Sequence, residues 1–420
     1  MRKQLMGLCI AGTLAAAPAT AAVSERDFAQ LRAEMGALVD RVEALERENA
    51  HLRELVADEG GVEGAAVVVA PARERPLDWS ERIKLSGDFR YRYEEIDVED
   101  LATRDRNRIR ARARITARLP GNVEVATEIA TGGDNPLSAN QTLGGGATRK
   151  DLGLNLAYAR WRPVEGAYLT AGKMKNPFYR PGDTGMLWDD DYNPEGIGAG
   201  WAGDRWFVHG LVSWLESDSV ADNKQATSGL QGGIKLALGD ARLTTGLGYF
   251  DIPVAGEAPF FGGPDVFFGN SFSCVDPDVR EQCRYRYDYE ELEWFAALDF
   301  SAFSLPAVLY ADAVQNLAAD DFDRGWLVGL RLGEAGARGT WELGYQYEDL
   351  EADAALGLVT DSNFAAGGTD GRGHKLYGMY ALERGVKLGL TWFINNEFGA
   401  DRQPRALTYD RVILDARFKY

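Results

Sequence analysis

One segment alternates arginine with small or apolar side chains, and it constrains the fold more than any other. From Arg106 to Arg118, odd positions 109 to 117 hold isoleucine or alanine, and even positions hold arginine except at Thr116. A period of two is that of a β-strand, whose successive side chains point to opposite faces. One face would suit lipid, and the other needs water or anions. The segment therefore predicts a wall strand of a transmembrane β-barrel with a wet interior.

The N-terminus has the pattern of a secretory signal. Arg2 and Lys3 precede an apolar stretch over residues 5–17, and Ala19-Thr20-Ala21 supplies a small-x-small cleavage site. No later run reaches the roughly 18 apolar residues that a membrane helix needs, so strands must do any spanning. We expect residues 1–21 to be removed and the mature protein to lie in the outer membrane of a Gram-negative cell.

Residues 22–57 carry a heptad pattern. The a positions are Phe28, Met35, Val42, Asn49 and Val56, and leucines 31, 38, 45 and 52 occupy d. This predicts a coiled-coil helix in the periplasm and a homo-oligomer, for which we favour a trimer. An amphipathic helix lying on its own barrel is the alternative. Residues 58–82, with Gly60-Gly61, Pro71 and Pro76, are predicted to be a linker.

Residues 83–420 predict an all-β domain, an antiparallel transmembrane barrel of about 16 strands. Short connections such as Pro120-Gly121 and Gly239-Asp240 alternate with long polar ones, as in outer-membrane barrels. In one predicted strand, Trp206 and Trp214 are spaced to reach the two interfacial aromatic girdles. The last segment ends with the aromatic Tyr420, which resembles the assembly signal of such barrels.

Charge and cysteine content exclude other classes. A formal net charge of -18 and a pI near 4.8 argue against a nucleic-acid partner. Cys9 leaves with the signal, and we expect Cys274 and Cys283 to form a disulfide in one exported loop. A metal-binding cysteine pair is the alternative, but it has no nearby histidine. We expect no metal and no cofactor.

The candidate functional surface is a basic wall inside the barrel. Its predicted members are Arg90, Arg92, Arg108, Arg110, Arg112, Arg114, Lys173 and Lys175. Such a wall would concentrate and steer anions. The alternative is a salt-bridged wall with no effect on selectivity, because Asp88, Glu124 and Glu128 lie on adjoining strands.

An acidic segment opposes this wall in sign. Asp189, Asp190, Asp191 and Glu195 lie in the third predicted external loop, which folds into the barrel in trimeric general porins. The segment would then create a transverse field across a constriction. The alternation of Asp189, Asp191, Asn193 and Glu195 also resembles calcium ligands, although Pro194 stands where a calcium loop needs glycine.

Two motifs carry a family resemblance. The sequences Gly172-Lys173-Met174-Lys175-Asn176-Pro177-Phe178 and Trp188-Asp189-Asp190-Asp191-Tyr192-Asn193-Pro194-Glu195-Gly196 resemble signatures of the bacterial putative-porin family. The resemblance implies an oligomeric outer-membrane porin with an N-terminal coiled coil and covers essentially the whole chain. The coiled coil and arginine-rich wall also resemble phosphate-selective porins, but the lysine cluster and tyrosine constriction of that group have no counterpart here.

These observations predict a passive diffusion channel for small hydrophilic solutes, with a preference for anions and with outer-membrane lipid around it. The alternative function is a structural tether, in which the coiled coil binds peptidoglycan and the barrel is an anchor. We do not expect an enzyme: among the histidines, His209 shares a strand face with Ser213, but such a pair is common by chance.

Overall fold

In a computed structural model of the chain, the described residues are 82–217, 224–402 and 405–420. The predicted signal peptide (1–21), coiled coil (22–57) and nearly all of the linker (58–82) lie outside them and stay predictions. Within the described residues, no helix combines the length and the apolar character needed to cross a membrane.

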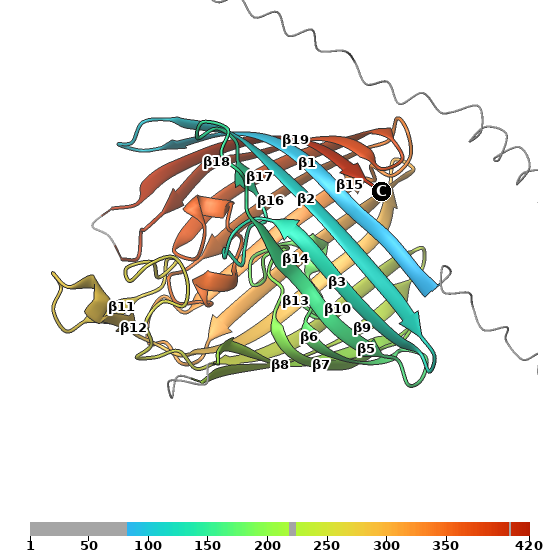
Figure 1. Ribbon diagram of the computed structural model, residues 1–420, viewed down its shortest axis with the longest axis horizontal. Helices are drawn as coiled ribbons and strands as arrows, with labels where there is room; N and C mark the ends of the chain where they lie inside the picture. The colour runs from blue at the N-terminus through green and yellow to red at the C-terminus, as the bar shows by residue number, and fades with distance from the viewer. Residues whose placement is uncertain (1–81, 218–223, 403–404) are drawn as a thin grey trace, which may run out of the picture. The chain divides into compact units, whose positions relative to one another are not determined.

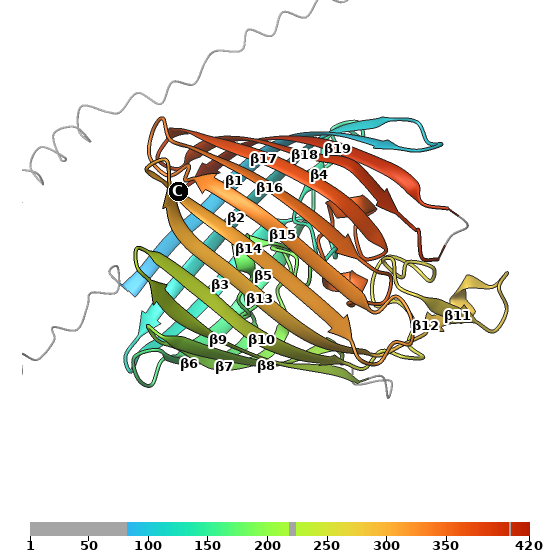
Figure 2. The same ribbon diagram turned by 180° about the vertical axis from the view of Figure 1, so that it is seen from behind.

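The described chain forms a closed antiparallel barrel, because the first strand pairs with the last as well as with the second (Figures 1 and 2). The main sheet has 17 strands, and β4 is a stub of 2 residues, which leaves the 16 long strands that the sequence predicted. The strands are β1 (Ile83–Val98), β2 (Arg104–Leu119), β3 (Val123–Thr131), β4 (Gln141–Thr142), β5 (Leu152–Trp161), β6 (Ala167–Lys173), β7 (Glu195–Ala202), β8 (Trp206–Glu216), β9 (Gln225–Leu238), β10 (Ala241–Ile252), β13 (Tyr289–Ala302), β14 (Leu305–Asn316), β15 (Arg324–Gly333), β16 (Trp341–Leu350), β17 (Gly371–Glu383), β18 (Val386–Phe398) and β19 (Leu407–Lys419).

Short turns gather at one end of the barrel and long loops at the other (Figure 1). We name four long loops L2 (132–151), L3 (174–194), L5 (253–288) and L7 (351–370). They contain four short 3-10 helices and a separate two-stranded sheet: η1 (Pro181–Asp183) in L3, β11 (Phe272–Cys274), η2 (Arg280–Gln282) and β12 (Cys283–Tyr285) in L5, and η3 (Gly357–Val359) and η4 (Phe364–Ala366) in L7. A disulfide joins Cys274 to Cys283, which face each other across β11 and β12.

The two faces of the barrel wall differ as the period of two requires. Along β8, Trp206 and Trp214 are 49% and 44% exposed on the outer face, whereas Phe207, Leu211 and Ser213 are buried on the inner face. Exposed leucine, isoleucine, valine and aromatic residues recur on the outer positions of the other strands. This surface suits hydrocarbon.

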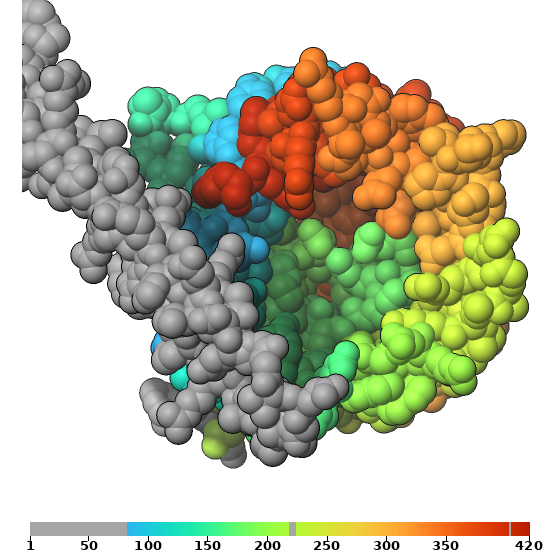
Figure 3. All heavy atoms as spheres, turned by 90° about the vertical axis from the view of Figure 1, so that its right-hand side faces the viewer, coloured from blue at the N-terminus to red at the C-terminus, as the bar shows by residue number. Residues whose placement is uncertain are grey.

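The lumen is not uniformly open, because three loops fold into it. Side chains of L3, L5 and L7 form one apolar cluster with inward residues of β8, β10 and β13 to β16. We call this cluster the plug; its buried members include Met186, Leu187, Trp188, Phe267, Tyr285, Leu356 and Leu358. Figure 3 looks at the turn end and shows the barrel hollowed, with green atoms of the segment that contains L3 inside it.

Close backbone approach holds L3 against the wall. Gly182 has φ 64°, and a Cβ atom built there would lie 2.6 Å from the ring of Tyr310 on β14. Glycine satisfies both requirements because it tolerates a positive φ and has no side chain. Next to it, Asp183 forms an ion pair of 3.0 Å with Arg331 on β15.

Candidate functional site

Three neighbouring strands build a basic surface inside the barrel. Pairing of β1 with β2 places Arg90 opposite Arg110 and Arg92 opposite Arg108. Closure of the barrel places Arg417 of β19 opposite Arg90 as well. We name this surface the arginine wall; its members are Arg90, Arg92, Arg106, Arg108, Arg110, Arg112, Arg114, Arg411 and Arg417.

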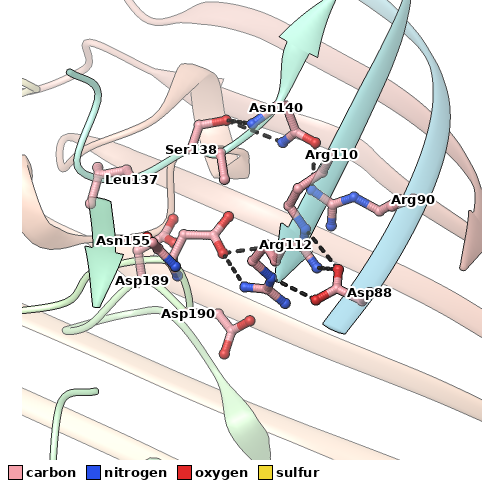
Figure 4. Close-up of polar contacts among 12 residues, drawn as sticks. Asp88, Arg90, Arg110, Arg112, Leu137, Ser138, Asn140, Asn155, Asp189 and Asp190 are labelled. Carbon is pink, nitrogen blue, oxygen red and sulfur yellow. Dashed lines mark hydrogen bonds and ion pairs between the residues drawn. The ribbon is translucent and has the colours of Figure 1, made fainter. Parts of the chain in front are cut away.

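Carboxylates on the same or adjoining strands are interleaved with these arginines. Asp88 contacts Arg110 at 3.0 Å and Arg112 at 2.6 Å (Figure 4). Asp415 contacts Arg92 at 2.7 Å and Arg417 at 2.8 Å.

Two glutamates complete the set. Glu94 is fully buried and pairs with Arg106, Arg108 and Arg411, and Glu128 pairs with Arg114 at 2.7 Å. The wall therefore holds nine arginines and four carboxylates, which leaves it positive although most of its guanidinium groups have an acidic partner.

The acidic triplet of L3 does enter the barrel, but its three members have different partners. Asp191 faces the wall and contacts Arg110 at 3.2 Å and Arg112 at 3.3 Å. Asp190 pairs with Arg180 of the same loop at 3.0 Å and stays exposed. Within the triplet, it is thus Asp191 that bridges L3 to the wall.

Asp189 is buried and links L3 to L7. Its carboxylate accepts hydrogen bonds from the backbone N–H groups of Asp191 at 2.8 Å and Ser362 at 3.0 Å. Burial, together with the charges of Asp361 and Asp191, raises the pKa of Asp189 to about 7. Asp189 is therefore the acid of the triplet whose charge changes near neutral pH.

The two predicted lysines separate at the end of β6. Lys173 is the last residue of the strand, in register with Glu195 and on the outward side that includes Leu169 and Ile197. It pairs with Glu195 at 2.7 Å outside the lumen, which corrects the predicted placement of both residues. Lys175 lies beyond the strand, where the alternation has ended.

Lys175 instead stabilises L3. Its ammonium group donates to the backbone oxygen of Asp190 at 2.9 Å. Burial lowers the pKa of Lys175, and the nearby charges of Asp190 and Asp191 oppose this shift. Within β6 the odd positions, Leu169, Ala171 and Lys173, face outward and Thr170 is buried, so the prediction took the wrong phase of the alternation for this strand.

The wall, L2, L3 and L7 together enclose a cavity of about 210 Å³, which we call the eyelet. Its charged lining comprises six cationic side chains (Arg90, Arg92, Arg110, Arg180, Lys375 and Arg417) and five acidic ones (Asp183, Asp189, Asp190, Asp191 and Asp361). Arginines of β1 and β2 and aspartates of L3 both line the eyelet, and Asp191 of L3 contacts Arg110 of β2 directly.

The predicted calcium ligands do not converge. Asp191 faces the arginines, and Glu195 pairs with Lys173 on the outer side. Over residues 82–217, 224–402 and 405–420, no group of three or more histidine, cysteine, aspartate or glutamate side chains could hold a metal ion.

Several residues of the site were not predicted. Arg411, Asp415 and Arg417 alternate with apolar residues on the last strand, and closure alone brings them to β1. That alternation, with the requirement that the last strand of a closed barrel pairs with the first, was a usable signal. Asn140 of L2 and Asp361 of L7 also line the eyelet, and no sequence pattern indicated this.

The family model described as putative porin matches residues 98–205 and 287–418, which is more than half of the chain. The chain belongs to the putative porin family. The match includes β2, nearly all of β19 and the segment from β6 through L3, and it begins at the last residue of β1. A comparison with curated proteins found no match.

Solved structures similar to this porin are outer-membrane porins of low sequence identity. The high-pH structure of Pseudomonas putida OprB has a TM-score of 0.54 and 12% identity, covering 81% of this chain and 95% of that one. A mutant of the Rh. blastica porin has a TM-score of 0.46 and 10% identity, covering 80% of this chain and 100% of that one. The likeness to OprB shows the barrel fold; the family match shows an outer-membrane porin.

Proposed function

We propose that this porin is a passive diffusion channel for small hydrophilic solutes that prefers anions. The excess of arginine on the wall carries the proposal, since nine arginines and four carboxylates share it, and Arg90, Arg92, Arg110 and Arg417 of this wall line the eyelet. A low-dielectric surround would strengthen the resulting potential. Translocation would be partition and drift without a chemical step, so no catalytic role is assigned.

The predicted residues of the wall, together with Asp191 and Lys175 of L3, have different proposed roles. Arg90, Arg92 and Arg110 line the eyelet and would attract anions. Arg108, Arg112 and Arg114 extend the positive wall, and Asp191 would set the direction of the transverse field by its contact with Arg110 and Arg112. Lys175 would hold L3 in position, as its bond to Asp190 suggests.

Planar-bilayer recordings in a salt gradient test this function. The wild-type reversal potential is expected on the anion side, and the double variant R110E/R112E is expected to shift it toward cations. A matched control is R372E, because Arg372 pairs with Glu397 at an exposed position away from the eyelet. A wild-type channel that prefers cations, or that never opens, would overturn the proposal.

We also propose that the mature protein is a homo-oligomer, with a trimer favoured, assembled in part by the coiled coil predicted over residues 22–57. The heptad pattern supports this because a lone helix would expose its apolar stripe. Chemical cross-linking of the detergent-solubilised protein should give a trimer, and deletion of residues 22–57 should reduce it. A strictly monomeric wild-type protein would contradict this.

The same segment motivates a second candidate function, a tether between outer membrane and cell wall. A helix of about 30 residues projects roughly 45 Å, which is long enough to approach peptidoglycan. Co-sedimentation of the full mature protein with cell-wall sacculi, compared with the 22–57 deletion, tests it. Equal sedimentation of both proteins would remove the tether and leave the channel intact.

A further inference from the structure

We propose that the eyelet contains a discrete binding site for a small oxyanion, of the size of phosphate or sulfate, centred on Arg90. The proposal rests on the proposed anion channel and adds to it a saturable site within the pathway. Free oxyanions in the external medium would be the source of the ligand.

The first observation is that Arg90 is buried without a close carboxylate of its own. The residue is 7% exposed, and its ion pair with Asp415 is at 4.0 Å. Among the described residues, its one short side-chain contact is to a neutral group, the side-chain oxygen of Asn140 on L2, at 2.6 Å. Since a buried guanidinium is costly unless charged or hydrogen-bonding partners surround it, Arg90 is short of acceptors.

The second observation is that Asp415 already serves other arginines. Arg92 donates to both of its oxygens, at 2.7 and 2.9 Å, and Arg417 donates to it at 2.8 Å. One carboxylate therefore faces three guanidinium groups. An additional negative charge near Arg90, Arg92 and Arg417 would be electrostatically favourable.

The third observation is a set of donors that have no acceptor. The Nε atoms of Arg90 and Arg417 are buried and have no hydrogen-bond partner within the described part of the chain. Both residues line the eyelet, so an anion in the cavity lies next to their guanidinium groups; the Nε atoms of Arg108 and Arg411, which do not line it, are also unpaired among the described residues. Almost every buried donor in a folded protein has a partner, so the Nε atoms of Arg90 and Arg417 point to a missing acceptor.

The geometry of the site favours an oxyanion over chloride. Arg90, Arg110 and Arg417 approach the cavity from three different strands, β1, β2 and β19. Planar guanidinium forks match the several acceptor oxygens of a phosphate or sulfate, which a single spherical ion does not offer. The cavity of about 210 Å³ also exceeds many times the roughly 10 to 15 Å³ that one water molecule needs.

The test measures block of chloride current in planar bilayers. With symmetric potassium chloride, addition of inorganic phosphate or sulfate to one chamber should reduce single-channel current saturably and reversibly. The R90Q variant should raise the half-blocking concentration at least tenfold, while R372Q, which loses the same charge at an exposed position, should leave it unchanged.

A second variant protects the test against misfolding of R90Q. Asn140→Asp places a carboxylate on the present partner of Arg90, so it should satisfy the guanidinium internally and also raise the half-blocking concentration at least tenfold. Heat-modifiable gel migration identifies the folded barrels. An Asn140→Asp channel blocked like the wild type would overturn the site.

The outcomes separate the site from the channel. A wild-type channel with an anion-side reversal potential but no saturable block would overturn the oxyanion site and leave the proposed function standing. Block that is identical in wild type, R90Q and R372Q would also overturn it. A reversal potential on the cation side would instead overturn the proposed function.

Discussion

The two halves of the lumen differ in what fills their inward-facing positions. Around β1, β2 and β19, inward charges are densely packed and paired with charges of opposite sign. Around β8, β10 and β13 to β16, inward positions are covered by the plug. The first half thus presents a charged surface to the lumen, whereas in the second half the inward side chains pack against the plug. A barrel of this size therefore need not conduct through its whole cross-section.

The acidic residues of the two halves show the same contrast. Glu94 and Asp415 on the wall have arginine partners, whereas the buried Glu291, Glu293 and Asp312 have no ion pair among the described residues. These three rely on neutral groups or have an unpaired oxygen: Glu293 accepts from Gln231 at 2.7 Å, and one oxygen each of Glu291 and Asp312 is unpaired. Among the described residues, opposite charge thus accompanies the buried acids of the wall but not these three.

Loosening the plug should reduce the difference between the two halves most. Trp188 is 6% exposed and packs against Phe178 and Phe250, so Trp188→Ala should cost about 3 to 5 kcal/mol of packing. We expect release of L3 and a several-fold rise in single-channel conductance. The control is Trp214→Ala, which removes an outward, exposed indole. Unchanged conductance in Trp188→Ala would mean that the plug does not limit the pathway.

Within the charged half, burial should determine how much an ion pair contributes to the free energy of unfolding. Asp415→Asn breaks a buried network with Arg92 and Arg417 and should cost about 3 to 5 kcal/mol of unfolding free energy. Asp190→Asn, whose partner contact is exposed, should cost about 0 to 1 kcal/mol. Urea-induced unfolding of both variants in detergent measures the difference, and equal losses would contradict this account of the wall.

The contact between the halves should respond to pH through Asp189. Its folded-state pKa of about 7 lies above the usual aspartate value, so its carboxyl is neutral at pH 5 and ionised at pH 8.5. Anion preference should fall over that range as one negative charge joins the eyelet. The stability contributed by this group is fully present below the usual aspartate pKa and is lost as pH rises through 7.

Reversal potentials at pH 5 and 8.5 measure the selectivity change. Asp189→Asn removes the titrating group while keeping an acceptor for the backbone of Ser362, so it should flatten the pH dependence. A wild-type reversal potential that is the same at both pH values would rule out ionisation of Asp189 in the pathway.

The smallest effect on selectivity is expected outside both halves, at the disulfide of L5. The bond closes a sequence separation of 9 residues, and in the chain-entropy model it contributes about 2 to 3 kcal/mol. C274S/C283S should speed proteolytic cleavage of the 274–283 hairpin and leave selectivity unchanged. A changed reversal potential would show that L5 positions the eyelet.

The sequence could predict the wall because alternation is a local property. The inward placement of Arg110 and its neighbours follows from the period of two, which is why the strand count and the two faces were correct. Lys173 was misplaced because the prediction took the wrong phase for β6, in which Leu169, Ala171 and Lys173 face outward. The register across β1 and β19 required closure of the barrel, which local alternation alone does not display.

The plug could not be predicted, since loops have no period. The apolar residues of L7, such as Leu356 and Leu358, resemble those of any external loop in composition, and only the folded barrel shows that they are buried. The partners of Asp189 and Arg90 in L7 and L2 depend on the same packing. The charged surface could therefore be predicted from the sequence, but the loops that pack opposite it could not.

Pairing of β1 with β19 has a consequence for biogenesis. The residues that complete the electrostatic environment of the first strand are among the last to leave the ribosome, since Arg92 finds Asp415 only when the two ends of the sheet meet. A chain that ends before β19 would leave Arg92 and Arg90 without Asp415 along an open seam, while Asp88, Glu94 and Glu128 would still pair with the arginines of β2. Closure of the barrel and pairing of Arg92 with its carboxylate therefore occur together.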